Sequence, residues 1–265
     1  MDLETFRMAM AAAVTPPGQQ EWGTPGTYSF VVPNVTEISA VTVGPGARGT
    51  SSYGNAGGDL RYAVSLPVTP GETLTIVIAS GTTASRTVIM RGSTVLLAAS
   101  NLYHYSSGLP SSTVDGVNIF GGNGGNGGDP PTQGSGTGGG GAGGYSGNGG
   151  RGGTMGAQPT AGTGGGGAGG TAGGGEGLAG RGGGGVGLKG EGLSGTTSGQ
   201  GGSGGGNSVQ QSSINGAAAG LYGGGGGGSG QSGSTFGTPG PGQSGGARII
   251  FGGGRYYPST NTQDL

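Results

Sequence analysis

Glycine makes up almost half of the residues between Gly121 and Gly246, and this stretch constrains the possible folds of the chain more than any other feature. Of the 78 glycines in the 265-residue sequence, 64 follow Phe120. Glycine loses more conformational freedom on folding than any other residue, so this composition is typical of flexible linkers and low-complexity segments. Collagen is excluded, because the tracts have no strict Gly-X-Y period and the chain holds only 14 prolines.

One ordered arrangement is compatible with such tracts. Helices of the polyproline II type have three residues per turn and no internal hydrogen bonds, so their N–H and C=O groups point outward. Without side chains, these helices can pack side by side and bond to several neighbours at once, as polyglycine II. Ordering the backbone costs about 1–2 kcal/mol per residue, and a net hydrogen bond returns about 0.5–1.5 kcal/mol. We therefore expect such an array to form only as a dense bundle that a hydrophobic core seeds.

Short segments with larger side chains interrupt the glycine tracts. A plain Gly/Ser linker has no use for these side chains, so we interpret the segments as turns and end caps between the rods of a folded array. The interruptions are Tyr145-Ser146, Thr154 to Pro159, Leu178-Ala179, Val186 to Leu193, Val209 to Tyr222 and Ser234 to Pro241.

The charge and composition of the chain exclude several classes of protein. Only 8% of the residues are charged and the net charge is −1, which argues against an electrostatic nucleic-acid binder. Cysteine is absent, so there is neither a disulfide framework nor a cysteine metal site. No apolar run approaches the ~20 residues that a membrane-spanning helix requires. We expect no nucleic-acid partner and no membrane span.

No combination of residues predicts catalysis. His104 is the only histidine, so Ser-His-Asp chemistry could be built only around it. The pattern G-x-G-x-x-G recurs by chance at this glycine density, and no copy lies between a strand and a helix as nucleotide binding requires. The acidic residues Asp115, Asp129, Glu176 and Glu191 lack the spacing of a metal site. We expect a protein that is not an enzyme and that uses no cofactor or metal.

Residues 1–22 predict a short helix followed by a linker. Leu3, Phe6 and Met10 recur at helical spacing on one face, and Pro16-Pro17 ends any helix. We interpret this segment as an attachment or oligomerisation peptide that docks on a partner. A secretory signal peptide is the alternative, but the start is acidic rather than basic and the apolar run is short.

Residues 23–120 predict a small antiparallel β-sandwich domain. Segments that are rich in β-branched residues or that alternate apolar and polar residues recur between turn signals, at 27–32, 37–43, 60–66, 73–78, 86–90 and 94–99. Ala247 to Phe251 predicts one more strand, which after such an excursion most simply pairs with the early β domain. The expected divisions are an N-terminal helix and linker (1–22), a β-sandwich (23–120), a polyglycine II array (121–246) and a return strand with a tail (247–265).

Three segments together resemble a known family. PGTYSFVVPNVTEISAVTVGPGARG (25–49) resembles the opening pattern PGTYTFTVPAGVTSVTV of the glycine-rich domain of bacteriophage tail and tail-fibre proteins. VTPGETLTIVIASG (68–81) is similar to its second hallmark, and GGARIIFGGGRYYPSTNTQDL (245–265) to the closing strand and tail of phage tail proteins. Residues 83–120 match no hallmark. The related adhesins of T-even phages imply a polyglycine II sandwich whose exposed end loops bind the host surface.

The resemblance implies a structural protein of the virion, located in the phage tail and made in the host cytoplasm without a signal peptide. We expect a fibre-tip or receptor-binding protein whose partners are other tail proteins and a host surface protein or polysaccharide. Self-association into a homo-oligomer such as a trimer is also expected. The alternatives are a non-receptor virion subunit (fibre, adaptor or decoration protein) and an ice-binding protein of the polyglycine II type.

Bulky side chains on loops of a rigid scaffold are typical of contact surfaces. The expected contact residues are Tyr145, Met155, Leu188, Tyr222, Phe236, Tyr256 and Tyr257. Tyr222 and Phe236 serve equally well as caps that pack over rod ends. Replacing Tyr145 with alanine is accordingly expected to leave the fold intact.

Overall fold

The computed structural model describes residues 15–81, 86–101, 117–129, 135–174, 177–209, 213–259 and 262–264. These ranges contain antiparallel sheets and no α-helix, which confirms the all-β class. The expected N-terminal helix, with Leu3, Phe6 and Met10, lies outside the described residues. The strands are β1 (Gly18–Trp22), β2 (Gly26–Val31), β3 (Glu37–Val43), β4 (Leu60–Pro67), β5 (Thr73–Ile78), β6 (Arg86–Arg91), β7 (Thr94–Ser100), β8 (Ile119–Phe120), β9 (Gln231–Ser232), β10 (Thr235–Phe236) and β11 (Gly246–Phe251).

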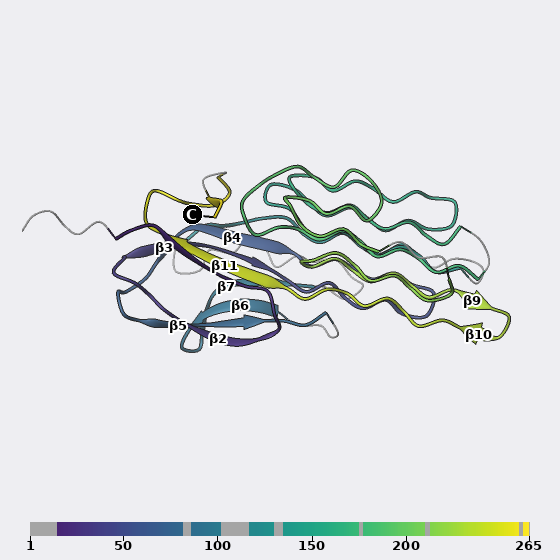
Figure 1. Ribbon diagram of the computed structural model, residues 1–265, viewed down its shortest axis with the longest axis horizontal. Coiled ribbons are helices and arrows are strands. Elements are labelled where there is room, and N and C mark those ends of the chain that lie inside the picture. Colours follow the sequence, from purple (N-terminus) through teal and green to yellow (C-terminus); the bar gives the residue numbers. More distant parts are fainter. Residues whose placement is uncertain are drawn as a thin grey trace, which may run out of the picture.

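Two antiparallel sheets form the β domain at one end of the molecule (Figure 1). One has the order β1-β11-β3-β4-β8 and the other β2-β5-β6-β7. Alternating residues of β5, among them Leu74 and Ile76, are buried and pack against Ile38 of β3 and Ile249 of β11 in one hydrophobic core. The strands expected from the alternation of apolar residues are therefore present, and the β6–β7 hairpin around Gly92 is confirmed.

The return strand β11 pairs with the early β domain, as expected, and lies second from the β1 edge of the five-stranded sheet. It pairs with β3 on one side and with β1 on the other. β1 itself falls within residues 1–22, where we expected a helix and a linker. Trp22 explains the difference, because its side chain is buried against Phe30 with ring centroids 6.0 Å apart and ties the segment to the core.

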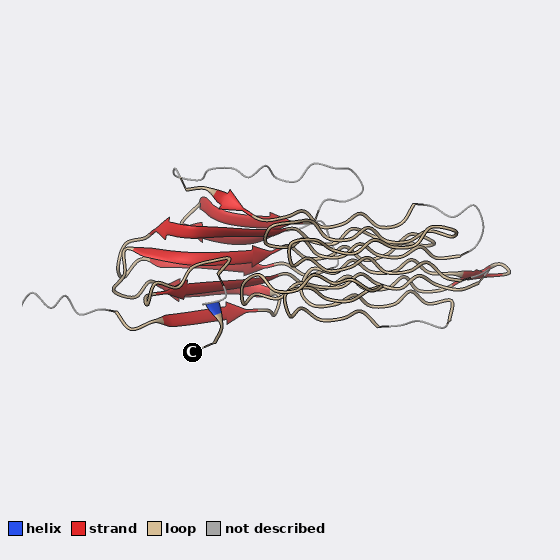
Figure 2. Ribbon diagram, turned by 90° about the horizontal axis from the view of Figure 1, so that it is seen from above, coloured by secondary structure: helices blue, strands red, loops and turns tan. Residues whose placement is uncertain are grey.

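Beyond the sheets, the glycine-rich segments run side by side along the long axis of the molecule (Figure 2). We call this region the glycine array; its proximal end adjoins the sheets, and its distal end carries the β9–β10 hairpin (Figure 1). Residues 135–144, here called the central segment, are all buried. Every backbone N–H from Gly136 to Gly144 donates a hydrogen bond.

Hydrogen bonds of the central segment repeat every three residues. Successive N–H groups bond to three different neighbouring segments, and the fourth returns to the first. The bonds join Gly138 to Gly153, Gly139 to Arg181, Gly140 to Asn55, Gly141 to Gly150, Ala142 to Gly184 and Gly143 to Gly58, with N···O distances of 2.8–3.0 Å. The carbonyl groups accept from three further segments, through donors that include Gly125, Gly167 and Gly225. The backbone is thus bonded in six directions.

A side chain has no room at most positions of the central segment. A Cβ built on Gly138 would lie 1.8 Å from the carbonyl oxygen of Gly170, and one on Gly140 would lie 1.8 Å from that of Gly125. Both obstacles are backbone atoms, so no side-chain rotation relieves the contact. Glycine is required here for the close approach of neighbouring backbones rather than for flexibility.

A second hydrophobic cluster joins the array to the five-stranded sheet. This seam cluster comprises Val41, Val43, Leu60, Tyr62, Ala142, Tyr145, Val186, Leu188, Ile250 and Tyr257, all buried. Its members come from β3, β4, β11, the array and the C-terminal segment. The seam cluster supplies the hydrophobic core beside which we expected the glycine segments to pack.

Candidate contact surface at the distal end of the array

Short turns at the distal end present large side chains to solvent. The β9–β10 hairpin reverses at Gly233, which has a φ of +59°, and places Phe236 with 51% of its surface exposed. In a second turn, the backbones of Thr154 and Ala157 bond to each other in both directions at 2.9 and 3.0 Å. Met155, at the tip of that turn, is 48% exposed.

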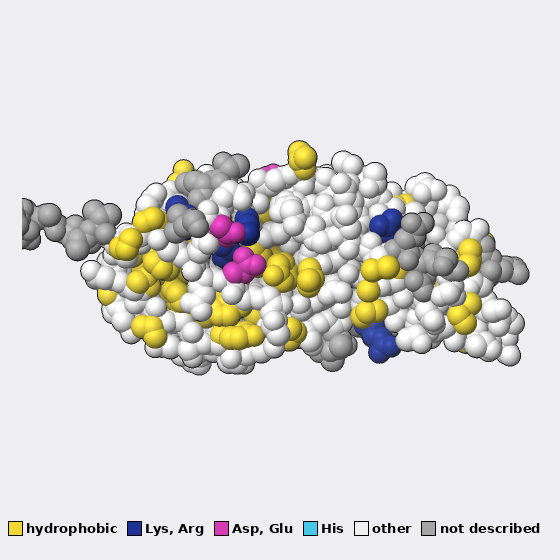
Figure 3. Space-filling model, in the orientation of Figure 1, with side chains coloured by type: hydrophobic (Ala, Val, Ile, Leu, Met, Phe, Trp, Pro, Cys, Tyr) yellow, Lys and Arg dark blue, Asp and Glu magenta, His cyan; other side chains and the backbone are white. Residues whose placement is uncertain are grey.

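A third exposed apolar side chain belongs to the same end. Leu178 is 39% exposed and follows Gly177, at which a Cβ would lie 3.8 Å from the Cβ of Ser232 in β9. The space-filling view shows hydrophobic side chains toward the distal end, separated from the β domain by a largely bare stretch of backbone and small polar groups (Figure 3). The distal end of the array therefore presents three exposed apolar side chains, those of Met155, Leu178 and Phe236.

The turn at Met155 borders a shallow pocket. This pocket has a volume of about 210 Å³ and is lined by residues 154–159 and 171–174. Its wall carries the hydroxyls of Thr154 and Thr171 and the amide of Gln158 beside the thioether of Met155. The Ser135 hydroxyl lies 3.5 Å from the Met155 sulfur and positions the turn from the central segment. The arrangement can hold a small apolar group and hydrogen-bond around it.

Three of the expected contact residues are not on the surface. Tyr145, Leu188 and Tyr257 retain 1%, 2% and 0% of their exposure, so the prediction that they contact a partner is wrong. The Tyr145 hydroxyl donates to the Gly187 carbonyl at 3.0 Å, and the Tyr257 hydroxyl donates to the Leu188 carbonyl at 2.6 Å. Burial raises the pKa of both phenols, which keeps them protonated as donors. These residues fix the seam cluster.

Tyr222 also lies at the proximal end, half-buried beside β1. Its hydroxyl donates to Glu21 Oε1 at 3.3 Å. Burial, followed by the neighbouring Glu21 carboxylate, raises the pKa of Tyr222. A Cβ on Gly23, just after β1, or on Gly246, at the start of β11, would collide with the side chain of Tyr222. Tyr222 therefore packs as a cap over these ends of β1 and β11.

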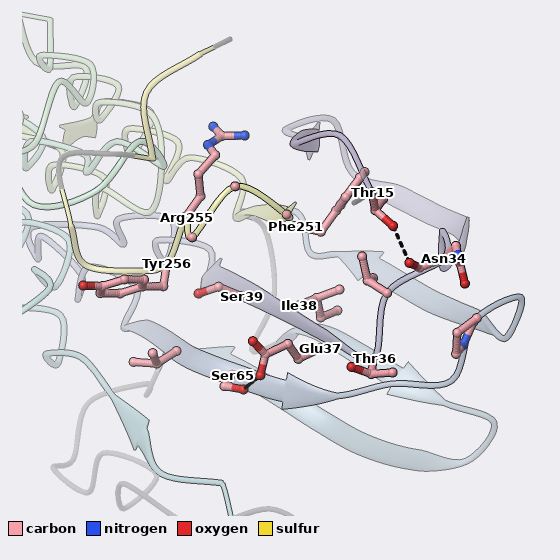
Figure 4. Close-up of a pocket in the computed structure, with 16 residues that line it drawn as sticks. Thr15, Asn34, Thr36, Glu37, Ile38, Ser39, Ser65, Phe251, Arg255 and Tyr256 are labelled. Atoms are coloured by element: carbon pink, nitrogen blue, oxygen red, sulfur yellow. Dashed lines mark hydrogen bonds between the residues drawn. The ribbon is translucent and has the colours of Figure 1, made fainter. Parts of the chain in front are cut away.

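Tyr256 is 49% exposed and lines a different pocket, in the β domain (Figure 4). This pocket has a volume of about 410 Å³. Glu37 and Ser39 of β3 lie along one wall, and Ser65 donates its hydroxyl to Glu37 (Figure 4). Arg255 is buried and bonds to the Gly18 carbonyl at 3.2 Å. Tyr256 and Phe236 therefore lie at opposite ends of the molecule and cannot form one surface.

Two further arginines stabilise the junction between the array and the five-stranded sheet. The sequence did not predict this role. Arg248 is fully buried and donates to the Thr262 carbonyl and, at 2.8 Å, to Gln19 Oε1. Arg61 lies 3.6 Å from Asp59, and both side chains are buried. Burial dominates this pair, because the pKa of Asp59 is raised despite the opposing effect of Arg61. The only sequence signal was an arginine between apolar strand residues.

Within the described ranges, no three His, Cys, Asp or Glu side chains gather into a possible metal site. The same ranges contain no helix with the length and hydropathy of a membrane span. The chain matches no protein-family model, and no curated protein is significantly similar to it in sequence.

Proposed function

We propose that this chain is a structural protein of a bacteriophage tail and that it acts at a fibre tip, where its distal turns contact the host surface. The observation that carries the proposal is the placement of Met155, Leu178 and Phe236 at the distal end of an elongated scaffold, beside Ser135, beside Gly136 and in β10 respectively. Exposed apolar side chains on loops of a rigid support are typical of binding surfaces. The sheets at the proximal end would attach to other tail proteins.

The glycine array would be a polyglycine II bundle. Its support is the three-residue repeat of the hydrogen bonds, because a helix with three residues per turn directs successive N–H groups toward three neighbours. Such a bundle carries few charged side chains and is braced in several directions by hydrogen bonds of the backbone. It would hold the distal turns in place without requiring a hydrophobic core of its own.

Binding would depend on shape and apolar contact, without chemistry on the receptor. Aromatic side chains frequently supply most of the energy of an interface, which makes Phe236 the first residue to test. Leu193 is a matched control, because it is 90% exposed and its carbonyl bonds to Ser203 at the proximal side of the array.

The experiment measures adsorption of the fluorescently labelled protein to a panel of bacterial strains, together with antibody labelling of virions in the electron microscope. We expect label at the fibre tip, and binding that Phe236→Ala weakens about tenfold while Leu193→Ala leaves it unchanged. Label on another part of the virion, with no cell binding, would identify a non-receptor subunit instead. Absence of the protein from virions would overturn the proposal altogether.

A further inference from the structure

A pocket of about 550 Å³ lies where the array meets the sheet, at the opposite end from the distal turns. Five separate parts of the chain build it. It is lined by Glu21, residues 187–192 and 203–206, Leu221, Tyr222 and Gln263. This volume falls within the ~300–1,000 Å³ typical of small-molecule sites. We call it the junction pocket.

Glycine forms much of the pocket wall, so backbone groups are accessible to a ligand. Gly190 and Gly204 have φ values of +91° and +77°, which leave turns without side chains at the wall. No atom lies within 4 Å of the position that a Cβ on Gly204 would take. A ligand can therefore approach the main chain of this turn closely.

Two carboxylates supply hydrogen-bond acceptors in the junction pocket. Glu191 accepts from the Ser146 hydroxyl at 2.6 Å through Oε1, and Glu21 accepts from the Tyr222 hydroxyl at 3.3 Å through its own Oε1. A carboxylate offers about four lone-pair sites, so each retains capacity for a ligand. The Gln263 side chain adds an amide to the wall.

Apolar surface accompanies these polar groups. Leu221 is 45% exposed, and the ring of Tyr222 is half-buried beside it. Tyr222 is oriented by its hydrogen bond to Glu21, which leaves the ring as a fixed platform. Aromatic rings with a polar tip suit ligands that are apolar on one face and hydroxylated at the edge.

The charge of the pocket selects against anions. Its lining holds the carboxylates of Glu21 and Glu191, and the one lysine, Lys189, pairs with Asp264. Because Glu21 Oε2 also lies 3.8 Å from Arg248 Nε, Glu191 carries most of the negative charge that a ligand would meet. Acidic and basic side chains lie close together on the face shown in Figure 3. Lys189 and Arg248 both pair with Asp264 of the C-terminal segment. A phosphate or carboxylate ligand would meet unfavourable charge here, whereas hydroxyl donors would form charge-assisted hydrogen bonds.

We propose that the junction pocket binds a neutral saccharide, such as one hexose unit of a polysaccharide. The sugar hydroxyls would donate to Glu191 and Glu21, and its C–H face would rest on Tyr222 and Leu221. This site is separate from the distal turns and does not depend on their proposed role.

The test uses the full-length protein with methyl α-glucoside, methyl β-galactoside and N-acetylglucosamine, each followed by saturation-transfer NMR and calorimetry. Inorganic phosphate and calcium chloride serve as the anionic and cationic probes. Glu191→Gln should lower the affinity for the sugar about tenfold, because a charge-assisted hydrogen bond is lost. Glu37→Gln is the matched control, since Glu37 likewise accepts from a serine hydroxyl but lines the pocket in the β domain.

We expect at least one sugar to bind. Glu191→Gln should lower the affinity for that sugar, and Glu37→Gln should leave the affinity unchanged. No binding of any sugar, binding of calcium or phosphate alone, or equal losses in the two variants would overturn the inference. Loss of host adsorption in Phe236→Ala with sugar binding intact would show that the two sites act separately. Sugar binding would stand even if the protein proved to have no receptor role.

Discussion

The ring of Tyr145 stacks on that of Tyr257, with centroids 5.9 Å apart and planes inclined by 12°. Tyr145 directly follows the central segment of the glycine array, and Tyr257 follows the return strand β11. Tyr62 of β4 contacts both rings, at 5.7 and 6.4 Å. The array is therefore attached to the sheet through aromatic contacts between residues that lie far apart in the sequence.

Replacing Tyr145 with alanine should destabilise the protein by about 3–5 kcal/mol, the range for removing a buried aromatic side chain. The change also removes the hydrogen bonds that Tyr145 makes with Gly187 and Gly190. This reverses the expectation that the substitution would leave the fold intact. Urea unfolding followed by circular dichroism measures the effect.

Tyr256→Ala is the control for that substitution, because Tyr256 is half-exposed. Tyr256→Ala should lower the free energy of unfolding much less than Tyr145→Ala does. Equal stabilities of the Tyr145→Ala protein and the wild type would contradict the role of the seam cluster.

Gly138→Ala should prevent the array from packing. Its Cβ would lie 1.8 Å from the Gly170 carbonyl oxygen, so neighbouring backbones must separate. Overpacking typically costs about 1–3 kcal/mol, occasionally more, and we expect the upper end here because no side chain can yield. Gly174→Ala is the matched control, since no atom of the described residues lies within 4 Å of its Cβ position. Soluble yield and melting temperature should fall in the first variant alone; equal behaviour would contradict the dense packing.

Hydrophobic patterning predicted most of the β domain. Leu74, Ile76 and Ile78 alternate toward the core as expected, and Ala247 to Phe251 pairs where the return strand was placed. Strand β1 was missed because Gly18 to Trp22 lacks β-branched residues, and only the packing of Trp22 commits it to the sheet.

The glycine array was harder to predict in detail. Glycine carries no pattern of side chains, so neither the order of the segments nor their register could be read from the sequence. An isolated aromatic such as Tyr145 gives no periodicity from which burial can be inferred, and it was assigned to the surface for that reason. Met155 and Phe236 are exposed as expected, while their contact role stays a prediction.

Arg61→Ala should destabilise the protein by about 3–5 kcal/mol, because it leaves a buried charge without its partner. Arg61 also donates to the Gly122 carbonyl at 2.7 Å and to Asn123 Oδ1 at 2.6 Å, which ties one array segment to β4. In the variant, the pKa of Asp59 should rise further, since the opposing effect of Arg61 is gone. Chemical unfolding at neutral pH measures the loss in free energy of unfolding. A loss below about 1 kcal/mol, the value of a weak surface ion pair, would contradict the prediction.

The Glu72–Arg91 pair should contribute stability only above acidic pH. Hydrogen bonds from Arg91 to Glu72, at 2.8 and 3.0 Å, lower the pKa of this carboxyl. The pair therefore stabilises the fold above the unfolded pKa of about 4.3, and the benefit disappears as the pH falls through the lower folded value. Glu72→Gln should cost about 0.5 kcal/mol at pH 7, because Arg91 is partly exposed. A difference from wild type that persists unchanged at pH 2 would contradict this assignment.

Amide hydrogen exchange across residues 136–144 tests the central claim most directly, because each of these N–H groups donates to the backbone of another residue. β11 provides the internal reference for a fully protected strand. If the hydrogen-bonded glycine array is correct, peptides from this segment will exchange as slowly as those from β11. Exchange at the rate of an unfolded peptide would contradict the account and leave the distal turns without a rigid support.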